Sequence, residues 1–171
     1  VRRLDARTGP RPAGPRGCSE PGQARLARRV TERLGFDYER GRLDVSLHPF
    51  CEGTGDDVRL TTRFETERPL DSLLGAIHEA GHGMYEQSLP EVHAGTVLAH
   101  AAGMAVHESQ SRLWENQVAR SRSFWGWCGA EFRAAFPEVE NATDAELHAL
   151  ANAPEPGGLI RVEADEAHYN L

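Results

Sequence analysis

The amino-acid sequence predicts a mainly α-helical domain with a small antiparallel β-hairpin. Several segments of the 171-residue chain carry apolar residues at a helical spacing, which is typical of helices that bury one face. Alternation of polar and apolar residues, the pattern of a half-buried strand, is confined to residues 43–64. Clusters of proline and glycine separate these segments, and the length suits one ordinary domain.

Composition excludes several classes of protein. The net charge of −7 argues against a nucleic-acid-binding protein, because phosphate binding requires a basic surface. No apolar run reaches the roughly 18 residues that a membrane span requires. Cys18, Cys51 and Cys128 lie far apart in the sequence and form no Cys-x-x-Cys pair, which fits a reducing compartment. We therefore expect a cytoplasmic protein that binds neither nucleic acid nor membrane.

The N-terminal part of the chain is expected to be a disordered or linker-like lead over residues 1–22, followed by the domain over residues 23–171. Eight of the fourteen residues from 9 to 22 are Gly or Pro, a composition that no helix or central strand can use. The first helix is predicted over residues 23–34. Leu26, Val30 and Leu34 recur there at every fourth position, and Gly35 ends the pattern.

An antiparallel hairpin is predicted next. Leu43, Val45 and Leu47 alternate with polar residues and indicate its first strand. Residues 52–56 are rich in turn-forming residues, and the alternation resumes over residues 57–64. We expect the two alternating segments to pair with each other.

The remainder of the chain is predicted to be helical. A helix is expected from about Asp71, as its N-cap, to residue 88, with an apolar stripe along one face. Further helices are expected over residues 97–119, over residues 123–136, from the cap Asp144, and from residue 159 to 171. Five aromatic residues are assigned to the core: Trp114, Trp125, Trp127, Phe132 and Phe136.

Residues 78–82 read HEAGH and match the pattern H-E-x-x-H. On a helix, His78 and His82 lie on one face a turn apart, so both imidazoles can reach one metal ion. Glu79 lies about 100° away around the axis, close enough to act on a water molecule at that ion. The competing interpretation is an exposed helix with two surface histidines, but the pair lies inside an amphipathic helix.

A catalytic metal site of this kind requires a third protein ligand. His93 and His100 follow the motif as isolated residues, which are more often structural. His107 and Glu108 are adjacent on a predicted helix that could pack against the first. From spacing alone, these two residues are equal candidates for the third ligand.

The sequence resembles the carboxypeptidase Taq family of thermostable metallocarboxypeptidases. The resemblance covers about residues 21–171 and rests on five motifs in the family order: H-P-F at residues 48–50, D-x-R-x-T at 57–61, H-E-x-x-H at 78–82, H-E-S-Q at 107–110 and I-R-x-x-A-D at 160–165. It implies a largely helical fold with a small sheet near the metal. It also implies that members are commonly homodimers.

The resemblance implies a role for each motif residue. Glu108 is the third ligand, ahead of His107, for one Zn²⁺ ion that Co²⁺ or another divalent ion could replace. Glu79 is the general base of peptide hydrolysis. The substrate is a peptide with a free C-terminal carboxylate, which an arginine can bind through two parallel hydrogen bonds. The candidate substrate-binding residues are Arg161 as first choice, then Arg59, His48 and Tyr169.

Each of these residues also has a structural interpretation. Arg59 could simply pair with Asp57, His48 could be a structural loop residue, and Tyr169 could be part of the core. Two other functions remain open. Family members are longer, and their final motif G-x-x-Q-D-x-H-W is absent from these 171 residues, which favours a truncated, inactive chain that still binds metal. The H-E-x-x-H motif by itself would equally support a zinc endopeptidase.

Overall fold

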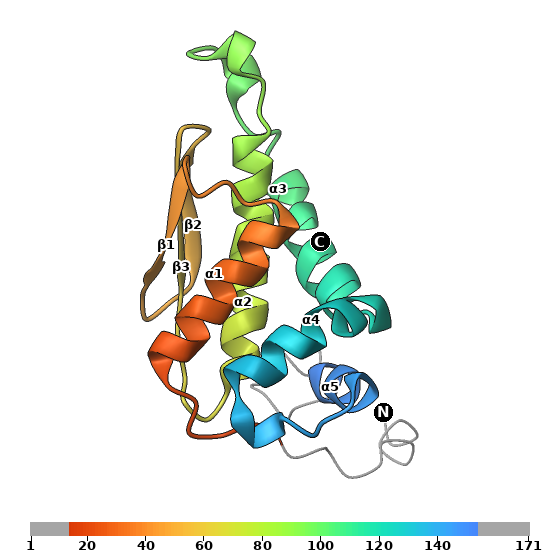
Figure 1. Ribbon diagram of the computed structural model, residues 1–171. Coiled ribbons are helices and arrows are strands. Elements are labelled where there is room, and N and C mark those ends of the chain that lie inside the picture. Colours follow the sequence, from red (N-terminus) through yellow and green to blue (C-terminus); the bar gives the residue numbers. More distant parts are fainter. Residues whose placement is uncertain (1–13, 154–171) are drawn as a thin grey trace, which may run out of the picture.

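A computed structural model describes residues 14–153 and confirms a mainly helical domain with one small sheet (Figure 1). The predictions for residues 159–171 lie outside this range. Five α-helices are described, together with three strands and several short helical turns. The α-helices are α1 (Glu20–Leu34), α2 (Pro69–Gln87), α3 (Met104–Arg112), α4 (Arg122–Ala135) and α5 (Asp144–Ala151). The strands are β1 (Gly41–Val45), β2 (Phe50–Thr54) and β3 (Asp57–Thr62), and the turns are η2 (Glu91–His93), η3 (Val97–Ala99), η4 (Leu113–Ala119) and η5 (Pro137–Val139).

Helix α2 is the central element, because α1, the sheet, α3 and η4 all pack against it (Figure 1). Its N-cap lies three residues earlier than predicted. Pro69 occupies the first helical position, where its fixed φ angle and missing N–H are tolerated, so Arg68 is the N-cap. Asp71 is therefore not the N-cap; its negative charge lies in the first turn, where the helix dipole stabilises it.

The sheet has the order β1-β3-β2 and is mixed. Strand β3 pairs in antiparallel orientation with β2, and in parallel orientation with β1. The hairpin therefore exists, but its first strand is residues 50–54, which overlap the segment predicted as a turn. Gly53 allows the tight connection: its φ is 132°, and a Cβ atom there would lie 2.0 Å from the Asp57 carbonyl oxygen.

Helix α1 begins inside the segment that was expected to be a lead. The Ser19 side chain accepts a hydrogen bond from the Gly22 amide, and Pro21 lies in the first turn, where proline is compatible with a helix. Cys18 is buried in the main core. Gly35, with a φ of 122°, ends the helix as predicted.

The long helix predicted over residues 97–119 is divided into three parts. Residues 97–99 form only the short turn η3, and Gly103, with a φ of 107°, separates it from α3. Beyond Arg112 the helix continues as the π-helical segment η4. The segment between α2 and α3 projects beyond the end of α2 (Figure 1). It exposes the apolar side chains of Val92, Val97 and Leu98, and Met104 at the start of α3 is exposed as well.

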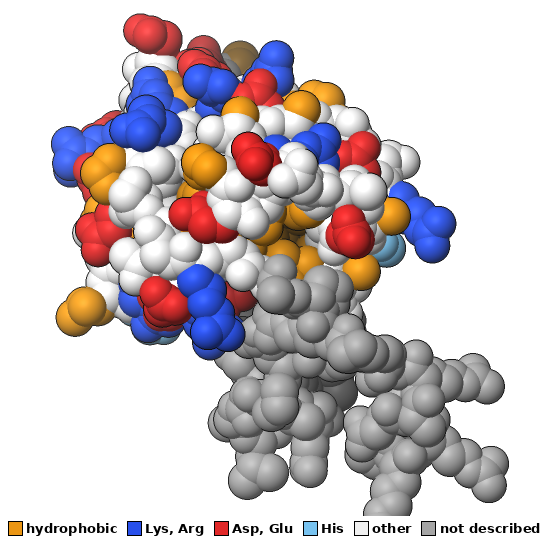
Figure 2. Space-filling model, turned by 60° about the horizontal axis from the view of Figure 1, so that its bottom comes forward, with side chains coloured by type: hydrophobic (Ala, Val, Ile, Leu, Met, Phe, Trp, Pro, Cys, Tyr) orange, Lys and Arg blue, Asp and Glu red, His pale blue; other side chains and the backbone are white. Residues whose placement is uncertain are grey.

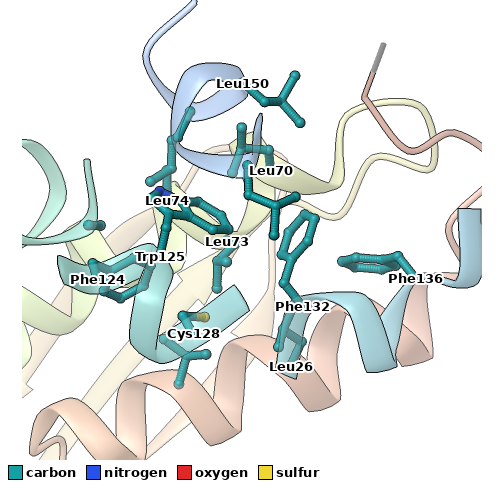
Figure 3. Packing of buried hydrophobic residues seen from close by; sticks show 14 of the residues in the cluster. Leu26, Leu70, Leu73, Leu74, Phe124, Trp125, Cys128, Phe132, Phe136 and Leu150 are labelled. Atoms are coloured by element: carbon teal, nitrogen blue, oxygen red, sulfur yellow. The ribbon is translucent and has the colours of Figure 1, made fainter. Parts of the chain in front are cut away.

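The main core lies where α1, α2, α4 and α5 meet (Figure 3). Its largest buried side chains are the predicted aromatics Trp125, Phe132 and Phe136, which pack against leucines of α1, α2 and α5. Trp127 is an exception, because 41% of it is exposed. The cap of α5 also differs by one residue: Thr143, not Asp144, is the N-cap of a capping box.

A smaller core lies between the sheet and α2. Val58 and Leu60 of β3 pack there with Phe36 and with Ala80, which belongs to the H-E-x-x-H motif. One face of the motif is thus fixed against the sheet.

On the surface shown in Figure 2, negatively charged Asp and Glu side chains are interspersed with positively charged Arg side chains. No helix among residues 14–153 is both long and apolar enough to cross a bilayer.

Candidate metal centre

Three side chains from α2 and α3 converge between the two helices. One ligand atom each of His78, His82 and Glu108 lies within 4.8 Å of the others. The Nε2 atom of His82 lies 3.2 Å from one carboxylate oxygen of Glu108, and Nε2 of His78 lies 3.6 Å from the other. All three side chains are more than 80% buried. Two imidazoles and a carboxylate in this arrangement are a common ligand set for zinc.

The two helices run antiparallel and touch at their backbones. A Cβ atom on Gly81 would lie 2.7 Å from Cα of Ser111 and 2.8 Å from the carbonyl oxygen of Gln110. Only glycine allows this approach. Glu108 and Ser111 are three residues apart and so lie on the same face of α3. The close contact at Gly81 therefore brings the Glu108 carboxylate between the two histidines of α2.

The ligand set fits a metal ion. Oε1 of Glu108 is buried and has no hydrogen-bond partner in the part of the chain that the structure describes. A buried carboxylate oxygen without a partner is costly, and a cation between the three side chains would remove that cost. Both facing imidazole atoms are Nε2, so each ring can present a lone pair to the same point.

Glu79 lies on the next face of α2 and is 7% exposed. Burial, opposed in part by the charge of His78 and reinforced by Glu108 and Glu115, raises the pKa of Glu79 to about 7. The charge of Glu79 in turn contributes to the high pKa of Cys51 on β2, which is raised to about 12 mainly by burial. Glu79 is thus a buried carboxyl beside the cluster, with a pKa near neutrality in the metal-free fold.

Each histidine of the cluster has a second polar partner at Nδ1. His78 Nδ1 lies 2.8 Å from Glu115 Oε2, and the other oxygen of Glu115 accepts a 3.2 Å hydrogen bond from Arg120. His82 Nδ1 lies 2.6 Å from Nδ1 of His107, whose Nε2 is 2.8 Å from Glu86. His107, the equal candidate for third ligand from spacing, therefore contacts a ligand instead of joining the cluster.

The two histidines differ in basicity as a result. Burial lowers the pKa of His78, but the hydrogen bond and charge of Glu115 outweigh it, and the net shift is upward. Burial, reinforced by the neighbouring His78 and His107, lowers the pKa of His82 to about 4. His82 is therefore neutral near pH 7, as a metal ligand must be.

Two of the candidate substrate residues, Arg59 and His48, do not belong to this cluster. Arg59 is on the exposed face of β3, because Val58 and Leu60 on either side point toward α2. It donates a 2.7 Å hydrogen bond to Asp57, the structural pairing considered above. His48 lies exposed in the loop between β1 and β2, with Nδ1 2.9 Å from the Pro49 carbonyl oxygen.

The remaining candidates, Arg161 and Tyr169, lie outside the described residues. A cavity of about 450 Å³ opens on another flank of α2, and Arg40, Met84, Tyr85 and Trp114 help to line it. None of the three clustered side chains lines this cavity. The cavity therefore adjoins the α2–α3 contact at Gly81 and Gln110 but is not lined by the clustered side chains.

Sequence reasoning missed Glu115, Arg120 and Glu86. One signal could have found Glu115: it follows Glu108 by seven residues, which is two helical turns, and so lies on the same helix face. Glu86 likewise follows His82 by four residues. Arg120 offers no comparable signal, because an α-helix does not bring residues 115 and 120 to one face.

The chain matches the family described as carboxypeptidase Taq (M32) metallopeptidase over residues 11–171. It is 45% identical over 150 residues to thermostable carboxypeptidase 1 of Thermus thermophilus, and 37% identical over 151 residues to carboxypeptidase 1 of Bacillus subtilis. Each alignment covers 87% of this chain, but only 29% and 30% of the respective relative. The chain thus spans about 30% of the length of these relatives.

Solved structures give the same result. The M32 carboxypeptidase of Deinococcus radiodurans R1 superimposes with a TM-score of 0.82 at 42% identity, covering 92% of this chain and 33% of that one. Metallocarboxypeptidase 1 of Trypanosoma cruzi superimposes with a TM-score of 0.81 at 34% identity, covering 99% of this chain and 33% of that one. The chain belongs to the carboxypeptidase Taq (M32) metallopeptidase family.

Proposed function

We propose that this chain forms the metal-binding and catalytic part of a zinc-dependent metallocarboxypeptidase. The observation that carries the proposal is the convergence of His78, His82 and Glu108 within 4.8 Å, with Glu79 buried beside them. Membership of a family of carboxypeptidases supports the reaction class.

The three ligands would hold one Zn²⁺ ion, and Co²⁺ or another divalent ion could replace it. When bound, zinc would polarise the scissile carbonyl and lower the pKa of water at the site to about 7. Glu79 takes a proton from the attacking water and later passes it to the leaving amine. Its position on the face next to His78 and its burial suit this role.

The substrate is a peptide with a free C-terminal carboxylate. Arg161 remains the proposed residue for that carboxylate, because its guanidinium can form two parallel hydrogen bonds with it. Tyr169 and His48 remain proposed substrate contacts. Arg59 is the less favoured candidate for binding the carboxylate because it already pairs with Asp57. The enzyme is proposed to be a cytoplasmic homodimer that binds neither nucleic acid nor membrane.

A second candidate is a chain that binds metal without turnover, and the observation that favours it is the 29–30% coverage of the relatives. The test uses the zinc-loaded chain with matched peptides that carry either a free or an amidated C-terminus. A carboxypeptidase releases the terminal residue of the free acid only, because amidation removes the carboxylate charge. Equal cleavage of both peptides at an internal bond would indicate an endopeptidase, and no cleavage by a metal-loaded chain would favour the second candidate.

A further inference from the structure

We propose that Glu115, held in place by Arg120, is a positioning residue for the metal ligand His78. The inference rests on the proposed metal site and extends it to the segment η4, which none of the recognised motifs includes. Its starting point is the 2.8 Å contact between Nδ1 of His78 and Oε2 of Glu115.

The contact fixes which nitrogen of His78 faces the metal. A carboxylate can only accept, so Nδ1 of His78 must carry the proton that it donates to Glu115. The lone pair is then on Nε2, the atom that lies 3.6 Å from the Glu108 carboxylate in the ligand cluster. The hydrogen bond also orients the ring and makes the imidazole a more basic ligand.

Helix geometry explains how the carboxylate is held. Arg120 follows Glu115 by five residues, and in an α-helix such residues are separated by about 140° around the axis. The segment Leu113–Ala119 is instead π-helical, a winding built on bonds between residues five apart. Nη2 of Arg120 consequently lies 3.2 Å from Oε1 of Glu115. The π-helical turn therefore lets one carboxylate bridge His78 and Arg120.

Arg120 is itself anchored at the end of another helix. Its Nη1 donates a 2.5 Å hydrogen bond to the carbonyl oxygen of Ala151, the last residue of α5. The Asn152 side chain donates a 3.0 Å hydrogen bond back to the Arg120 carbonyl oxygen. A cation at a helix C-terminus is stabilised by the exposed carbonyl groups there. The contacts form a continuous line from α5 through Arg120 and Glu115 to His78.

The two histidine ligands are supported in different ways. His82 meets the imidazole of His107, whereas His78 meets a carboxylate directly. Within residues 14–153, the hydrogen bonds of the cluster therefore give only His78 a negatively charged partner at Nδ1. A purely structural ion pair between Glu115 and Arg120 would stabilise the fold without affecting the metal, and an experiment can separate these roles.

The test compares Glu115→Gln with the wild-type chain. The amide keeps the size of the side chain but not its charge, so zinc affinity measured by competition with a chelator should fall about tenfold or more. The absorption spectrum of the Co²⁺-loaded chain should shift as well, because the ligand field of His78 changes. Arg120→Met should weaken zinc binding less, and it should add little to the effect of Glu115→Gln in the double variant.

Glu131→Gln is the matched control. Glu131 of α4 is 25% exposed and pairs with Arg29 and Arg33 of α1, whereas Glu115 is 18% exposed. The control should lose the ion pairs of a carboxylate of similar burial and keep the zinc affinity and the Co²⁺ spectrum of the wild type. Thermal unfolding of each metal-free variant records the structural cost separately.

The possible outcomes are distinct. Weaker zinc binding and an altered spectrum in Glu115→Gln, but not in Glu131→Gln, would support the inference. Unchanged affinity in Glu115→Gln, while His82→Ala abolishes binding, would overturn this inference and leave the metal site intact. A wild-type chain that binds no metal would overturn the metal site and the inference together.

Discussion

Gly81 and Ser111 bring two helices into backbone contact, since a Cβ atom on Gly81 would lie 2.7 Å from Cα of Ser111. The contact lies between the helix that carries His78 and His82 and the helix that carries Glu108. The third ligand reaches the other two only because this spacing is so short. Gly81, an unspecified position of the H-E-x-x-H motif, is therefore as important to the proposed site as the three side chains of the cluster.

Gly81→Ala should push α3 away from α2 and weaken metal binding strongly. Forcing a methyl group into such a contact typically costs about 1–3 kcal/mol, and the displaced Glu108 would no longer complete the site. Gly75→Ala is the control on the same helix, because its added Cβ would meet only Thr62 Oγ1 at 3.5 Å, an ordinary contact. Calorimetric zinc titration should show loss of affinity in the first variant and none in the second. Equal affinities would mean that the helix contact does not position Glu108.

Glu79→Gln should separate metal binding from chemistry. The amide cannot accept a proton, so turnover of any peptide that the zinc-loaded chain cleaves should fall by roughly 10²–10⁴. Zinc content should stay at the wild-type value, because Glu79 is not in the ligand cluster. Kinetics and metal analysis on the same preparation provide the test. Near-normal turnover would assign the base to another residue.

The same substitution should stabilise the metal-free chain more at high pH than at low pH. Burial is the chief reason that the pKa of Glu79 is raised to about 7 in the fold, from 4.5 for an unperturbed glutamate. Between these values the native state binds more protons than the unfolded state, so the stability contribution declines as pH rises through this window. The free energy of unfolding of Glu79→Gln, measured relative to that of wild type, should therefore be higher at pH 8 than at pH 4. The expected increase is on the order of 1–3 kcal/mol. Urea unfolding at several pH values measures this difference, and a constant difference would contradict the raised pKa.

The three cysteines should be slow to alkylate in the folded chain. Burial raises the pKa of Cys128 to about 12, and Glu131 adds to the shift. Burial likewise raises the pKa of Cys51 to about 12 and of Cys18 to about 11. Thiolates are the reactive form, so iodoacetamide labelling at pH 8 should be at least about 100-fold slower than in urea. Rapid labelling of one thiol in the native chain would show that its segment is open.

Most helices and the two histidines of the proposed metal site could be predicted from the sequence because both depend on local spacing. The i, i+4 pair His78 and His82 needs only a helix, and the apolar stripe around it predicts one. The choice of Glu108 over His107 could not come from spacing. It depends on the contact at Gly81, which determines the face of α3 that meets α2.

Strand pairing and helix winding could not be predicted in the same way. The alternation over residues 43–47 indicated a strand, but the parallel pairing of β1 with β3 depends on how the connection folds back through β2. The π-helical winding of η4 leaves no periodic signature in seven residues. The pair formed by Glu115 and Arg120 was invisible for that reason.

Zinc stoichiometry tests the central claim most directly. The purified chain, stripped with a chelator, reloaded and desalted, should contain about one zinc ion per chain by elemental analysis. His82→Ala should contain none, and His100→Ala, which changes an exposed histidine outside the cluster, should contain as much as wild type. Full zinc occupancy in His82→Ala would contradict the assignment of His78, His82 and Glu108 as the metal ligands.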